Sequence, residues 1–122
     1  MSALTIIFAS LAALLHVLFF VLESVLFRRA TVWGRFGVKS QADAETIAPM
    51  AYNQGFYNLF LALGVVVGLV LGNEDAGKGI VIFACACMVG AALVLVTNNV
   101  KLARSAAIQG IAPLIAIIGA FL

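Results

Sequence analysis

The chain has 122 residues, of which 65% are hydrophobic and 10% are charged, and its formal net charge is +2. A soluble domain carries about a quarter charged residues. The low charged content and the mean hydropathy of +1.20 therefore exclude a soluble protein and indicate an integral membrane protein. The net charge is small and confined to two loops, so it bears on membrane topology and lipid headgroups and does not indicate nucleic-acid binding.

Four apolar segments predict an all-α fold, a four-transmembrane-helix bundle that forms one integral membrane domain over residues 1–122. The helices are expected at approximately residues 3–27, 47–71, 79–97 and 103–122. Each segment is close to the roughly 20 residues that cross a bilayer core of about 30 Å. The first run is too long for a secretory signal and lacks a basic leader and a cleavage site, so we expect it to be kept as a helix.

Basic residues are concentrated in the first and third connections between these segments. Six of the seven Lys and Arg residues lie there, namely Arg28, Arg29, Arg35, Lys39, Lys101 and Arg104. Loops rich in Lys and Arg stay in the cytoplasm. We therefore expect both loops on the cytoplasmic side and both termini outside.

The long first connection places Trp33 and Phe36 among basic residues, which suits a segment lying in the headgroup region. An ordinary anchored loop would explain the same pattern. At its end, Ser40 opens the run SQADAE, which is typical of a helix start. Pro49 would be tolerated in a first helical turn. The second helix is expected to begin between these two residues.

The first span carries two ionisable residues, His16 and Glu23. Such groups are costly at membrane depth and therefore indicate function by default. Their seven-residue spacing predicts one shared helix face, about 10 Å apart along the axis. A neutral hydrogen-bonding histidine, and an ion pair of Glu23 with Arg28 or Arg29, are the structural alternatives.

The second span opens with a polar cluster, AYNQGFYN, that holds Tyr52, Asn53, Gln54, Tyr57 and Asn58. Amides exposed to lipid would lack partners, so these groups must face protein, water or a ligand. Hydrogen bonds between helices could explain part of the cluster.

Small residues follow in the same span, because Gly64, Gly68 and Gly72 are spaced by four. This spacing lets another helix approach closely, and we interpret the stripe as a packing surface.

The last two spans offer fewer chemical groups. Gln109 precedes Pro113, which cannot donate to the carbonyl of residue 109, so a kink with a freed acceptor is expected there. Cys85 and Cys87 point about 200° apart on a helix and are interpreted as small packing residues. A single histidine excludes a multi-histidine metal site within one chain.

Three elements carry a resemblance to a known family: LHVLFFVLE (Leu15–Glu23), NQGFYNLFLALG (Asn53–Gly64) and QGIAPLIA (Gln109–Ala116). In this order they resemble the small bacterial four-helix membrane proteins grouped as a family of unknown function. The resemblance covers essentially the whole chain and implies fold and membrane location, with no activity or cofactor.

A more distant likeness is to the membrane-associated eicosanoid and glutathione metabolism proteins, which are four-helix chains that assemble as trimers. Gln54, Tyr57 and Asn58 stand where those enzymes show amide, carboxylate and amide, and no arginine precedes them in the helix. The likeness therefore implies a similar architecture and not thiol-activating chemistry.

These observations predict a protein of the bacterial inner (plasma) membrane that binds a small or lipophilic ligand in a polar pocket near the cytoplasmic side. The expected pocket residues are His16, Glu23, Asn53, Gln54, Tyr57, Asn58 and Gln109. Membrane lipids and a second copy of the chain are the expected partners. A proton- or cation-coupled transporter working as an oligomer, and a structural assembly partner without a ligand, are the alternatives. Whether the protein is an enzyme stays open.

Overall fold

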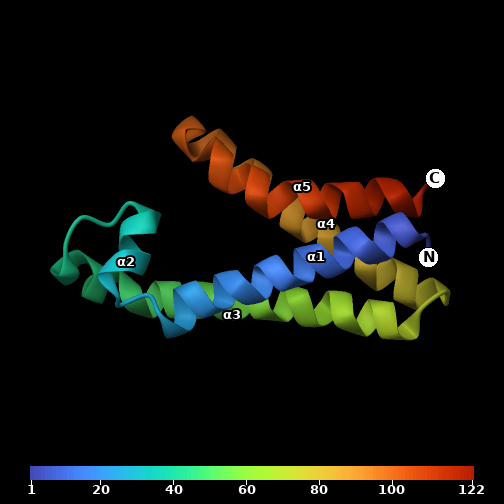
Figure 1. The fold of residues 1–122 in the computed structure, drawn as a ribbon, viewed down its shortest axis with the longest axis horizontal. Helices are drawn as coiled ribbons and strands as arrows, with labels where there is room; N and C mark the ends of the chain where they lie inside the picture. The colour runs from blue at the N-terminus through green and yellow to red at the C-terminus, as the bar shows by residue number, and fades with distance from the viewer. The chain divides into compact units, whose positions relative to one another are not determined.

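The computed structural model describes residues 1–122 and contains helices and turns without strands (Figure 1). The main helices are α1 (Ala3–Phe20), α2 (Ala30–Trp33), α3 (Gln41–Leu71), α4 (Asp75–Asn98) and α5 (Ala103–Ala120). Short π or 3₁₀ turns are η1 (Val21–Val25), η2 (Gly34–Phe36) and η3 (Val100–Leu102). Four helical spans are long and apolar enough to cross a membrane. The expected all-α class with four transmembrane helices is confirmed.

Helix α3 begins at Gln41, between Ser40 and Pro49 as expected, and ahead of residue 47, where the apolar span was expected to start. Ser40 caps it, because its side-chain oxygen accepts a hydrogen bond of 3.1 Å from the backbone N–H of Asp43. Pro49 lies inside the helix, so its expected place in a first turn is wrong. The helix is longer than a bilayer core requires, since about 20 residues counted back from Leu71 reach only to Tyr52. Its first turns therefore extend beyond the apolar span.

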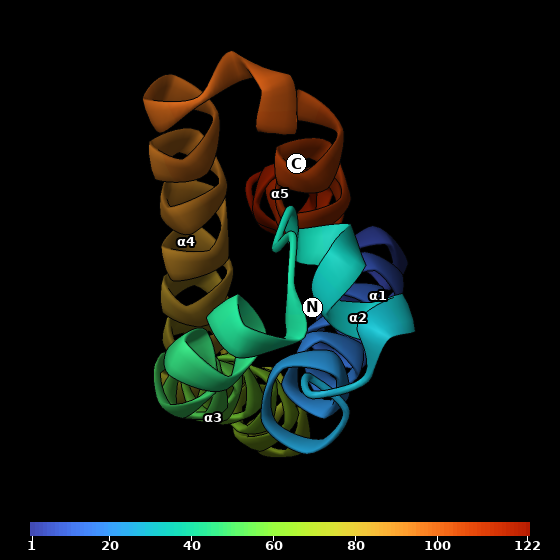
Figure 2. The same cartoon turned by 90° about the vertical axis from the view of Figure 1, so that its left-hand side faces the viewer.

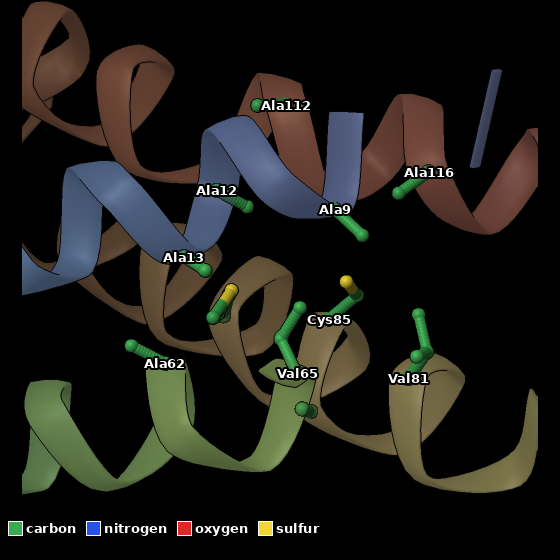
Figure 3. Packing of buried hydrophobic residues seen from close by; sticks show 11 residues of the cluster. Ala9, Ala12, Ala13, Ala62, Val65, Val81, Cys85, Ala112 and Ala116 are labelled. Carbon is green, nitrogen blue, oxygen red and sulfur yellow. The ribbon is translucent and has the colours of Figure 1, made fainter. Parts of the chain in front are cut away.

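The residues divide into two compact units, which we describe separately: Met1–Leu15 with Leu61–Leu122, and His16–Phe60. In the first unit, small side chains from α1, α3, α4 and α5 form the core. Its buried members are Ala9, Ala12, Ala13, Ala62, Val65, Val81, Ala84, Cys85, Met88, Ala112 and Ala116. Figure 3 shows alanines of several helices around Val65 and Cys85. Small residues let the helix backbones approach closely, which is how helices pack without a hydrophobic driving force. Cys85 is a packing residue of this core, as expected.

The glycines of α3 have different roles in this unit. A Cβ on Gly68 would lie 2.6 Å from Val81 Cγ2 and 2.9 Å from the carbonyl oxygen of Gly77, so α3 and α4 are nearly in backbone contact there. A Cβ on Gly64 would only reach ordinary contact with Ala84, at 3.7 Å. Gly72 has φ +69° and ends α3. The packing interpretation is therefore right for Gly68, and wrong for Gly72, which forms the turn.

Helix α5 passes through Pro113, which is buried in the first unit. The ribbon of α5 changes direction along its length (Figure 1), and a proline inside a helix removes one helical hydrogen bond. A Cβ on Gly110 would lie 2.8 Å from Ala92 Cβ, so α4 and α5 also approach closely.

Both chain ends of the first unit lie together with the turn between α3 and α4 (Figure 1). The Ser2 hydroxyl donates to the carbonyl oxygen of Gly119 at 3.1 Å, and the Thr5 hydroxyl donates to that of Ala116 at 3.1 Å. These bonds fasten the start of α1 to the end of α5. The η3 turn joins α4 and α5.

The second unit contains the end of α1, the first connection and the first half of α3. Phe27 is buried against three alanines of α3, Ala44, Ala48 and Ala51, and Trp33 and Val38 pack against the same cluster. Figure 2 shows this connection, cyan to green, beside the first turns of α3. The connection is therefore folded onto α3, and the extra turns of α3 provide its packing surface.

Candidate functional site

Glu23 lies in a π-helical turn at the end of the first span. The turn covers Val21–Val25, and the N–H of Leu26 donates to the carbonyl oxygen of Val21 at 2.9 Å. Such wide turns are rare and occur frequently at functional sites. The winding changes after Phe20, so the uniform 100° step that placed His16 and Glu23 on one face is wrong for this part of the helix.

The carboxylate of Glu23 is held by an amide of α3. Asn58 Nδ2 donates to Glu23 Oε1 at 2.6 Å, and Asn58 is only 5% exposed. Hydrogen bonds with an ionised partner are short and strong. This bond joins two of the residues that the sequence singled out.

Arg28 does not pair with Glu23. Its Nε donates to Glu45 Oε2 at 2.8 Å, in an ion pair whose side chains are 64% and 49% exposed. Exposed pairs contribute little stability. The alternative of a simple ion pair between Glu23 and Arg28 is therefore not what the structure shows.

Ser24 brings the π-helical turn close to α3. Its hydroxyl donates to the carbonyl oxygen of Tyr52 at 2.7 Å. A Cβ on Gly55 would lie 3.0 Å from Ser24 Cβ and 3.1 Å from the Ser24 backbone nitrogen, so only glycine leaves room for the crossing. An aromatic contact adds to it, because the rings of Phe20 and Phe56 lie edge to face with centroids 5.0 Å apart.

A small hollow opens beside this crossing, with a volume of about 60 Å³. Its lining consists of Glu23, Ser24, Val25, Phe27, Arg28, Ala48 and Tyr52. The lining contains both polar and apolar residues. The hollow has room for a few heavy atoms, since one water molecule needs about 10–15 Å³ of such space.

Side chains of the connection and of α3 form a polar network next to the hollow. Trp33 Nε1 donates to Gln41 Oε1 at 3.1 Å, and Gln41 Nε2 donates to the carbonyl oxygen of Arg28 at 3.2 Å and to Glu45 Oε1 at 3.0 Å. The network holds Arg28 and the start of α3 in place.

A family model matches residues 10–121, and its description is "Protein of unknown function (DUF1304)". The chain belongs to this family. No curated protein and no solved structure matches the chain. The match confirms the expected membership of a family of unknown function. The likeness to the eicosanoid and glutathione proteins has no support.

The matched range of DUF1304 contains every expected site residue, but the structure brings only some of them together. His16 is buried, with its ring 5.1 Å from that of Phe19. Asn53, Gln54 and Tyr57 are exposed. Gln109 is half-buried and belongs to the first unit.

Sequence reasoning missed Ser24, Gly55 and the Arg28–Glu45 pair. One signal was available, because Ala44, Ala48, Ala51 and Gly55 follow each other at steps of four, three and four. Small residues at these steps mark a packing face. The stripe extends the face well before residue 47, and it would have predicted the close crossing.

Proposed function

We propose that this DUF1304 protein resides in the bacterial inner membrane and binds a small amphiphilic ligand at Glu23, near the cytoplasmic side. The supporting observation is a half-buried carboxylate, held by the buried amide of Asn58 and adjoining an open hollow. Burying a carboxylate at such a position costs free energy unless a partner compensates its charge. The hollow provides the space in which that partner would bind.

The shape of the hollow limits the ligand. The hollow of about 60 Å³ is small and open, and it suits a small polar group. Glu23 lies two residues before the end of the apolar span Ala3–Val25, so a headgroup bound there would leave its chain in the lipid. An amphiphile satisfies both conditions.

Two other functions compete with ligand binding. A transporter would need further copies of the chain, and the exposed polar side chains Asn53, Gln54 and Tyr57 give a surface on which a second copy could bind. A homo-oligomer stays a prediction. A purely structural partner would leave the hollow empty. Flux through reconstituted vesicles would establish the transporter. A purified protein without a bound molecule would favour the structural partner.

The substitution Glu23→Gln tests the proposal. Glutamine keeps the shape and can still bond to Asn58, but it removes the charge. We expect the protein to fold as before and to lose its co-purifying ligand, measured by native mass spectrometry after gentle extraction. Loss of the fold together with the ligand would contradict the proposal and assign Glu23 a structural role.

The orientation of the chain is a further prediction. Reporter tags at either terminus should be labelled from outside the cell, because the Lys and Arg residues of the first and third connections favour the cytoplasm. The reactive tag is compared with the same tag inserted after Lys101 in the third connection, which should be protected. A C-terminal tag that is labelled only from the cytoplasm would show the opposite orientation. The Glu23 site would then lie near the outer side.

A further inference from the structure

The hollow beside Glu23 offers a carboxylate that has no ion-pair partner. Glu23 Oε1 accepts from Asn58, and an ionised carboxylate can accept several more hydrogen bonds. The Ser24 hydroxyl already donates to the carbonyl oxygen of Tyr52. The protein therefore supplies acceptors here that are best satisfied by a ligand rich in donors.

The only cation of the lining is balanced by another group. Arg28 lines the hollow, but its Nε is bound to Glu45 at 2.8 Å. Glu45 lies outside the lining and balances Arg28, so Glu23 is the carboxylate of the hollow that has no ion-pair partner. An anionic ligand would meet a net negative site, whereas a cation would complete the charge balance.

Aromatic and apolar groups form the rest of the lining. Phe27 and Tyr52 belong to the lining, together with Val25 and Ala48. Aromatic rings attract cations through their quadrupoles. The apolar residues suit the first carbons of a chain attached to the charged group.

We infer that the polar group bound beside Glu23 is a primary ammonium carried by an amphiphile. This inference rests on the proposed function and names its ligand class. An ammonium supplies three donors in a small volume, which the hollow of about 60 Å³ accommodates. The ammonium can belong to a phosphatidylethanolamine headgroup or to a free single-chain amine.

The test uses the full chain in phosphatidylcholine nanodiscs, titrated with dodecylamine, dodecanol or dodecanoate. Fluorescence of Trp33, the one tryptophan, reports binding, because Trp33 packs against the cluster of Phe27. Empty nanodiscs correct for partition into the lipid. We expect saturable binding of dodecylamine at least tenfold tighter than binding of dodecanol.

Variants then assign the effect to Glu23. Glu23→Gln should lower dodecylamine affinity to that of dodecanol, whereas Glu74→Gln, at an exposed site in the turn between α3 and α4, should not change it. Arg28→Gln removes the guanidinium of the lining and should tighten dodecylamine binding without tightening dodecanol binding, so it serves as a second variant if Glu23→Gln does not fold by circular dichroism. Loss of amine binding in Arg28→Gln would overturn the inference.

The remaining outcomes separate this inference from the proposed function. Equal affinity for amine and alcohol, or tighter binding of dodecanoate, would overturn the ammonium class and leave ligand binding in place. No saturable binding of any probe would overturn both. Adding phosphatidylethanolamine to the nanodiscs identifies the source, since competition with dodecylamine supports a lipid headgroup and its absence supports a free amine.

Discussion

Replacing Gly68 with leucine is expected to destabilise the protein by about 3 kcal/mol or more. A Cβ at this position would lie 2.6 Å from Val81 Cγ2, 2.9 Å from the Gly77 carbonyl oxygen and 3.0 Å from the Val81 backbone nitrogen. Two of these three neighbours are backbone atoms, which cannot rotate away. The helices α3 and α4 would have to separate, and their packing contacts would be lost.

The measurement is the free energy of unfolding in mixed detergent micelles, followed by circular dichroism. Gly90→Leu is the matched control, because a Cβ at Gly90 has no atom within 4 Å and the residue also lies in the middle of a span. The control should unfold close to the original protein. Equal stability of both variants would show that α3 and α4 do not touch at Gly68.

Replacing Asn58 with leucine is expected to cost about 2 kcal/mol. Leucine has a similar size but cannot donate to Glu23 Oε1, whose bond to Asn58 Nδ2 is 2.6 Å long. The carboxylate would lose its protein donor while it stays half-buried. A charged group left without a partner is more costly than the bond itself is worth.

Asn53→Leu is the control for this substitution, since it makes the same change on the same helix at an exposed amide. Its effect should stay within about 0.5 kcal/mol. Combining Asn58→Leu with Glu23→Gln should recover about 1 kcal/mol relative to the sum of the single effects, because a neutral side chain suffers less from the lost donor. Additive effects would contradict a direct bond between the two residues.

The four spans could be predicted from the sequence because they depend on local properties. A lipid environment forces each backbone polar group to bond within its own segment, so an apolar run of sufficient length must be helical. The cap at Ser40 is equally local, since a side chain three residues away from a backbone N–H decides it. Glu23 could be singled out because a charge in such a run is costly.

The composition of the site could not be predicted in the same way. Asn53, Gln54 and Asn58 are chemically alike and lie within two turns of one helix, yet only Asn58 reaches Glu23. Arg28 and Arg29 both follow the first span, and Arg28 binds Glu45 on another helix. These choices depend on how each helix is rotated and shifted against its neighbour, which a hydropathy pattern does not contain.

The sequence by itself determined the class of protein, the number of spans and the one carboxylate late in the first span, because each depends on the free energy of single groups in lipid. Only the tertiary structure decided which amide holds Glu23 and where the hollow opens. The π-helical turn at Val21–Val25 changes the winding just before the crossing. The close approach of Ser24 to Gly55 then sets the register between the two helices, and a register is a property of a pair of helices and not of either sequence segment alone.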